Sequence, residues 1–113
     1  MPKTRVILEL GSGNDLHGSN YTTAALRAVQ DALHHSSLSF IRSLKIDMKK
    51  VDVDVTIGVQ RPEQVDLATV KASLPIGNVT VKAVKGGLDV PDPENNDPAV
   101  IASAAIAVRI DVV

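Results

Sequence analysis

The chain has 113 residues, the size of one domain, and a formal net charge of −1. With only 2% aromatic residues it lacks both the positive field and the stacking side chains of a nucleic-acid binder. It contains no cysteine, which excludes disulfides and thiolate metal sites, and no apolar run near the ~20 residues of a membrane span. We therefore expect one cytoplasmic domain over residues 1–113, with no nucleic-acid or membrane partner.

The N-terminal stretch predicts a strand over residues 4–10 that ends at Gly11, where a glycine-rich turn begins. This turn, residues 11–18, reads Gly-Ser-Gly-Asn-Asp-Leu-His-Gly. Residues two apart in extended backbone point to the same side, so the Asp15 carboxylate and the His17 imidazole are expected to face one small volume. Glycine lets a ligand approach the backbone closely. The candidate ligand contacts in this turn are Gly11, Gly13 and Gly18.

The same turn has a purely structural interpretation. In it, Asp15 caps a helix and His17 is merely solvated. Short single motifs have many chance matches, so the pattern alone leaves both interpretations open.

A helix is predicted after the turn, because apolar residues recur with helical spacing from Ala25 to Leu33. His34 and His35 follow at its end, where the helix dipole favours a cation. More apolar residues over 38–44 indicate that helical structure resumes after two serines. The candidate N-caps of the first helix are Ser19, Asn20, Thr22 and Thr23.

Residues 51–59 are the clearest strand, with apolar residues at the odd positions. On its polar face, Asp52 and Asp54 are either a metal pair or the solvent- or subunit-facing side of an amphipathic strand, and the alternation favours the second. Asp66 is expected to cap a short helix that ends near Leu74.

The C-terminal third predicts two strands joined by a loop. Residues 79–85 form a strand that ends at a Gly-Gly pair, and residues 89–98 contain three prolines, typical of an exposed loop. The last strand covers about residues 100–112. Its alanine-rich part, residues 102–107, implies that a helix or another subunit approaches closely.

The resulting element order is β-α-β-α-β-β, an α/β (α+β) fold. Strands separated by helices favour parallel pairing, with the helices on one face of a single mixed four-stranded sheet. The helices are too few to cover both faces. A bare face with small apolar residues favours self-association, so we expect an oligomer.

The motif Gly-x-Gly-x-Asp-x-His-Gly resembles that of a small family of uncharacterised proteins in bacteria and plants, over the whole chain. The chain is also distantly similar to methylerythritol cyclodiphosphate synthase, the zinc lyase of isoprenoid biosynthesis, which opens with a strand and Gly-x-Gly-x-Asp-x-His. Residues 25–33, 51–62 and 79–83 resemble, in the same order, its first helix, its central strand and the strand before its catalytic loop.

The resemblance to the synthase implies a chorismate mutase-like, cyclodiphosphate synthase-like fold. It also implies a homotrimer in which the sheets face the threefold axis and clefts lie between neighbours. In that arrangement Asp15 and His17 match two of the zinc ligands, and both residue types are good zinc donors.

The chain departs from the synthase at the third ligand, where a histidine is replaced by Arg27. A guanidinium is permanently charged and cannot bind a metal. The threonine and glutamate that act on the diphosphate are also missing from residues 82–87. We therefore do not expect synthase activity, and a divalent metal such as zinc would need another ligand from His34, His35 or a neighbouring subunit.

Arg27 beside Asp15 and His17 suits general acid–base chemistry on a small anionic molecule, either a carboxylate or a phosphate. Lys82 and Lys85, near the edge of the next subunit, would add positive charge. The alternative is that Asp15 and Arg27 only hold the turn against the helix. Two functions therefore stay open: a small homotrimeric lyase- or hydrolase-like enzyme, and a non-catalytic oligomeric module that binds a metal or metabolite.

Overall fold

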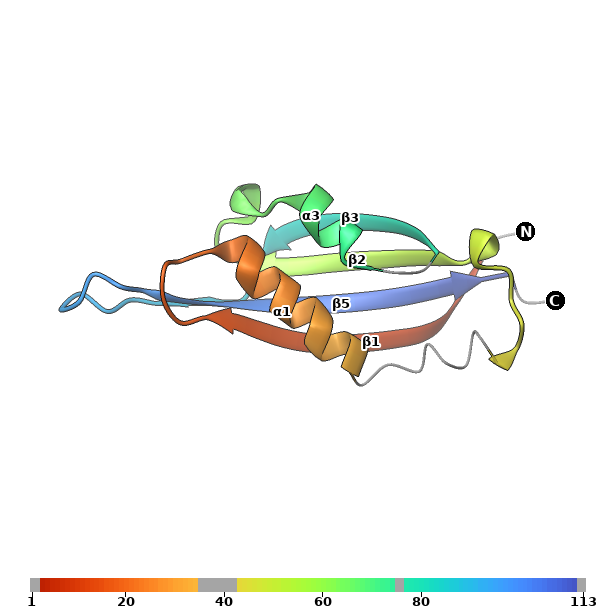
Figure 1. Cartoon of the computed structure of the whole chain (residues 1–113), viewed down its shortest axis with the longest axis horizontal. Helices are drawn as coiled ribbons and strands as arrows, with labels where there is room; N and C mark the ends of the chain where they lie inside the picture. The colour runs from red at the N-terminus through yellow and green to blue at the C-terminus, as the bar shows by residue number, and fades with distance from the viewer. Residues whose placement is uncertain (1–2, 35–42, 75–76, 112–113) are drawn as a thin grey trace.

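A computed structural model describes residues 3–34, 43–74 and 77–111. In these residues, five strands form one open mixed sheet, and two α-helices lie on one of its faces (Figure 1). The elements are β1 (Thr4–Asp15), α1 (Tyr21–His34), β2 (Asp52–Val59), α3 (Leu67–Ala72), β3 (Asn78–Lys85), β4 (Leu88–Val90) and β5 (Ala99–Ile110), with short 3₁₀ helices at Met48–Lys50 and Pro62–Gln64.

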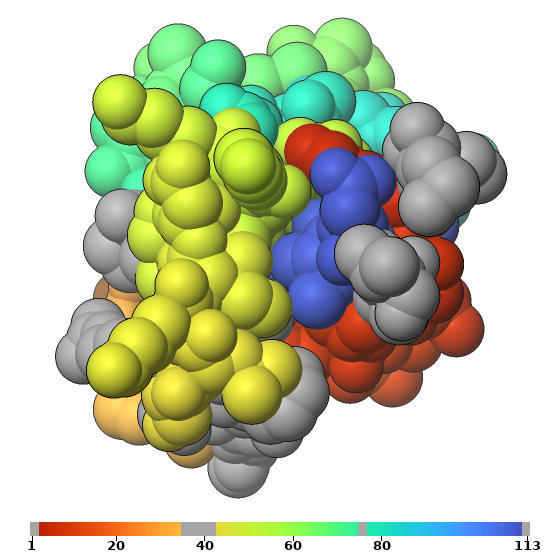
Figure 2. Space-filling model, turned by 90° about the vertical axis from the view of Figure 1, so that its right-hand side faces the viewer, coloured from red at the N-terminus to blue at the C-terminus, as the bar shows by residue number. Residues whose placement is uncertain are grey.

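The strand order is β1-β5-β2-β3, and the short strand β4 also pairs with β5. Parallel pairing across a helix is confirmed for β2 and β3, but β1 does not pair with β2. The long strand β5 lies between them and is antiparallel to both. In the end-on view of Figure 2, the blue end of β5 accordingly lies between red N-terminal residues and yellow-green residues of the β2 region. The two strands expected to pair across the proline-rich loop, residues 79–85 and 100–112, are not neighbours, because β2 lies between β3 and β5. The short strand β4 pairs with β5 instead, which makes the sheet five-stranded rather than four-stranded.

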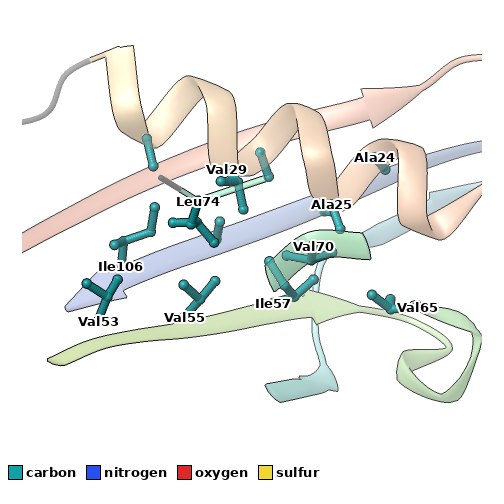
Figure 3. Close-up of a cluster of buried hydrophobic side chains, with 14 of the residues drawn as sticks. Ala24, Ala25, Val29, Val53, Val55, Ile57, Val65, Val70, Leu74 and Ile106 are labelled. Atoms are coloured by element: carbon teal, nitrogen blue, oxygen red, sulfur yellow. The ribbon is translucent and has the colours of Figure 1, made fainter. Parts of the chain in front are cut away.

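The core lies between the sheet and the helices (Figure 3). The odd residues of β2 and the even residues of β5 point toward the helices and are buried. In β2 this is the alternation that the sequence predicts, and β5 alternates in the same way. The largest fully buried side chains are Ile57, Ile106, Val29, Val51, Val53, Val55, Val59, Val70, Val100 and Val108.

Both helices begin at side chains that the sequence marks as caps. Asn20 accepts a hydrogen bond from the Thr23 N–H at 3.0 Å, and Asp66 accepts one from the Thr69 N–H at 3.2 Å. The second helix ends at Ala72, slightly before the expected end. No helix in the described ranges is long and apolar enough to cross a membrane. Of the helical structure expected over 38–44, residues 38–42 lie outside the described residues, as does His35.

Strand β1 is longer than the sequence suggests, because it continues through the glycines to Asp15. Gly11 and Gly13 pair with Ala104 and Ala102 of β5, so the expected end of the strand at Gly11 is wrong. The reason for the two glycines is the helix above them. A Cβ on Gly11 would lie 2.5 Å from the carbonyl oxygen of Ala28, and one on Gly13 would meet the backbone of α1 in the same way.

None of the described helices covers the second face of the sheet, here called the open face. Its side chains come from the alternate positions of the strands, including Thr56 and Lys82. Large aliphatic side chains on the open face that stay exposed are Leu8, Leu10, Val84, Leu88 and Val90.

Candidate functional site

Asp15, the last residue of β1, is tied to the start of α1. Its Oδ2 accepts a hydrogen bond from the Asn20 N–H at 2.9 Å. Its Oδ1 lies 3.7 Å from Nη1 of Arg27, and the Asp15 side chain is only 13% exposed. The same Arg27 nitrogen donates to the Asn14 carbonyl oxygen at 2.7 Å. These contacts hold the connection between β1 and α1 against the helix.

His17 lies in that connection with its side chain 82% exposed, and its Nδ1 is 2.6 Å from Oδ2 of Asp97. The other oxygen of Asp97 accepts a hydrogen bond from the Gly18 N–H at 3.2 Å. These two interactions lower the pKa of Asp97, the His17 hydrogen bond being the larger cause. A carboxylate acceptor at Nδ1 selects the tautomer that carries its proton there, which leaves Nε2 as the basic nitrogen.

Asp97 is the residue of this site that the sequence does not point to. It belongs to the proline-rich loop, 80 residues away from His17 along the chain. A single aspartate in an exposed loop has no spacing signal that would join it to His17. Only the pairing of β1 with β5, which brings Asp15 opposite Val100, places the two segments side by side.

The structure brings Arg27 to Asp15 but directs Asp15 and His17 to different partners. The same-side rule for residues two apart applies only to extended backbone, and β1 ends at Asp15. Gly18 has a φ of +93°, so its glycine is required by the backbone conformation. The remaining candidates, Lys82 and Lys85, lie in β3 at the opposite edge of the sheet from β1, away from Asp15 in the same chain.

The residues as arranged do not fit a resident zinc ion. Both oxygens of Asp15 face donors, namely the Asn20 N–H and the Arg27 guanidinium. His17 has only Nε2 left after its contact with Asp97. In the described ranges, no group of three or more histidine, aspartate or glutamate side chains could hold a metal ion.

A second buried contact supports the start of α1. The Tyr21 hydroxyl donates to Oδ2 of Asp89 in β4 at 2.5 Å, and Tyr21 is only 6% exposed. Burial, and then this hydrogen bond, raise the pKa of Tyr21 above its ordinary value of 10.0. Because the folded pKa is raised, the contact stabilises the fold fully below pH 10 and is lost as the pH rises through the folded pKa.

The tyrosine titration gives a direct test, because the chain has one tyrosine and no tryptophan. We expect the tyrosinate absorbance of the folded protein to appear above pH 10. Asp89→Asn should move that midpoint down, since it removes the negative charge next to the hydroxyl and replaces a carboxylate acceptor by a weaker, neutral amide oxygen. Asp92→Asn is the matched control in the exposed loop. Equal tyrosine titration midpoints for Asp89→Asn and Asp92→Asn would contradict the hydrogen bond between Tyr21 and Asp89.

Comparison with known proteins places the chain among proteins without an assigned function. Among curated proteins, none matches it. The crystal structure of an FtsZ-like protein of unknown function from Nostoc punctiforme is similar, with a TM-score of 0.85, 36% sequence identity and coverage of 99% of each chain. Residues 5–108 match the family described as conserved hypothetical protein (Lin0512_fam). The chain therefore belongs to this family, Lin0512_fam.

Proposed function

We propose that the connection between β1 and α1, together with Asp97, is the active site of a small enzyme. It transfers a proton on a small anionic molecule, with lyase- or hydrolase-like chemistry. The single observation that carries the proposal is the exposed His17 imidazole, whose Nδ1 is held by Asp97 at 2.6 Å. An imidazole oriented in this way by a carboxylate presents Nε2 as a general base.

Arg27 supplies the second element of the proposal, the charge that would hold the substrate. Its side chain is 58% exposed, and the contacts with Asp15 and Asn14 both use Nη1. A guanidinium has five N–H donors in a planar fork, which suits a carboxylate or a phosphate. In this proposal Asp15 keeps Arg27 in place, and Gly18, which has no side chain, leaves space for the substrate beside the imidazole.

We further propose that the chain assembles as a homotrimer with clefts between subunits, in the chorismate mutase-like arrangement that the synthase resemblance implies. The uncovered sheet face supports self-association, because it exposes Leu10, Val84 and Leu88 together. In such an assembly Lys85, at the end of β3, would belong to a neighbour's cleft, whereas the Lys82 side chain lines the open face of its own chain.

The proposal is tested by turnover of small carboxylates and phosphate esters, followed by nuclear magnetic resonance. For a compound that the protein converts, His17→Gln should lower the rate by about 10²–10⁴-fold, the usual contribution of a general base. Asp97→Asn should cost less, because it disturbs only the tautomer and orientation of the imidazole. Arg27→Gln should mainly raise KM.

The matched control is His34→Gln, which makes the same change at the exposed end of α1. Turnover that survives His17→Gln as well as it survives His34→Gln would overturn the active-site assignment.

The alternative is a non-catalytic module that binds a metabolite. It is favoured by the Asp15–Arg27 contact, which by its geometry fixes the connection to α1. If no compound is converted but one binds, with affinity that depends on Arg27, this alternative replaces the enzyme.

A further inference from the structure

The open face carries a hollow of about 390 Å³ at the end of the sheet where β5 terminates. Its floor consists of small side chains of β5 and β2, namely Ala105, Ala107 and Thr56. Leu8 of β1 and Thr80 of β3 lie at its sides. Because the floor residues are short, the longer side chains around them enclose a depression rather than a flat sheet surface.

Three cations line this hollow, and they come from three strands: Arg5 of β1, Lys82 of β3 and Arg109 of β5. One carboxylate, Asp54 of β2, lies among them. Three positive charges against one negative charge leave a local charge of +2, in a chain whose net charge is −1. Such a local excess in a concave site attracts anions.

The strand register explains why these cations meet. Arg5 lies directly opposite Arg109 across β1 and β5, and Lys82 lies opposite Thr56 across β3 and β2. In Figure 2 the red N-terminal residues and the blue end of β5 lie next to each other at this end of the molecule. Residues directly opposite each other on neighbouring strands have Cβ atoms only about 5 Å apart, so two like charges there repel unless an anion lies between them.

Only part of this positive charge is compensated by the protein. Nε of Arg109 donates to Oδ2 of Asp54 at 3.1 Å, and both side chains stay more than 40% exposed, at 43% and 48%. In the part of the chain that the structure describes, neither Arg5 nor Lys82 forms an ion pair. The next carboxylate along β2, Asp52, is already paired with Lys3 at 3.0 Å.

We propose that this hollow is a binding site for a small molecule with two or more anionic oxygens, such as a phosphate or a polycarboxylate. Arg5 and Arg109 bind one oxyanion group from two sides, and Lys82 binds the other end of the molecule. The hydroxyls of Thr56 and Thr80 supply neutral hydrogen bonds. The hollow is separate from the His17 site. Arg109 belongs to the hollow, whereas Val100 lies opposite Asp15, and these two residues of β5 are nine residues or about 30 Å apart along the strand.

Isothermal titration calorimetry of the full chain at constant ionic strength tests this site, with pyrophosphate and citrate as the two probes. We expect saturable binding of at least one of them, and the better probe identifies the oxyanion class. Arg5→Gln and Lys82→Gln should each weaken that binding about tenfold or more, since each removes a charge-assisted hydrogen bond. Asp54→Asn should tighten it, because it removes the one carboxylate among the described residues that line the hollow and releases Arg109.

Lys71→Gln is the matched control, since Lys71 lies on α3, on the helix-covered side of the sheet. No saturable binding of either probe, or the same loss for Lys71→Gln as for Lys82→Gln, would overturn the proposal. It would also be overturned if the variants changed only the molar mass of the protein, because the cations would then pair with carboxylates of another copy. Neither result bears on His17, whose variants are read out by turnover.

Discussion

Gly13→Ala is expected to destabilise the protein by about 3 kcal/mol or more, at the upper end of overpacking effects. The added Cβ would lie 2.6 Å from the Ala24 carbonyl oxygen and 2.6 Å from the carbonyl carbon of Arg27, with the Ala28 nitrogen also in its way. These are backbone atoms of α1, so no side-chain rotation relieves the clash. The helix would have to move away from the sheet and give up its buried alanine contacts.

Urea unfolding followed by circular dichroism measures the change in the free energy of unfolding. The control is Gly58→Ala, the same substitution in β2 but on the open face. There the nearest atom to an added Cβ is the Cα of Gly86 at 3.4 Å, so we expect a cost below about 1 kcal/mol. Similar urea midpoints for Gly13→Ala and Gly58→Ala would mean that α1 does not pack directly against Gly13.

Leu10→Glu is expected to convert the proposed homotrimer into monomers without unfolding them. Leu10 is 64% exposed and lies beside a second, apolar hollow of about 600 Å³ on the open face, lined also by Ser103 and Val84. A carboxylate at this position would have to leave water when the interface forms, which costs free energy that leucine does not, even though Lys85 lines the same hollow. The fold itself should tolerate the change, because Leu10 does not belong to the core.

Light scattering coupled to gel filtration measures the result as a molar mass. The wild type should have three times the 11.9 kDa mass of the chain, and Leu10→Glu should have one. Leu44→Glu is the matched control, since Leu44 is 53% exposed and lies outside the strands. If wild type and Leu10→Glu have the same mass, the open face is not the interface between copies.

The stretch that contains Leu10 and Gly13 shows how far a local sequence pattern predicts structure in this chain. Gly13 and Leu10 both lie in a stretch that the sequence describes as a strand followed by a turn. Glycine is usual in turns and also where two backbones meet closely, and a single sequence does not separate these uses. The pairing with β5 and the position of α1 decide between them, and both depend on residues far away in the chain.

In the candidate site, too, one contact could be anticipated before the structure and the others could not. Arg27 of α1 reaches Asp15 because the helix packs back on the strand that precedes it, and the resemblance to the synthase implies this proximity. His17 finds Asp97 only through the β1–β5 ladder, and Arg5, Arg109 and Lys82 come together only through the order β1-β5-β2-β3.

The sequence by itself determined the elements whose signals are local. The alternation of β2, the helical spacing of α1 and the cap at Asp66 depend on neighbours within a few residues, where backbone geometry is the same in any fold. For the cap of α1 the sequence leaves four candidates, of which the structure uses Asn20. The tertiary structure alone decided the length of β1, the use of its glycines and the partners of His17 and Arg109. These depend on which strands are adjacent, and adjacency results from burying one shared core rather than from any local pattern.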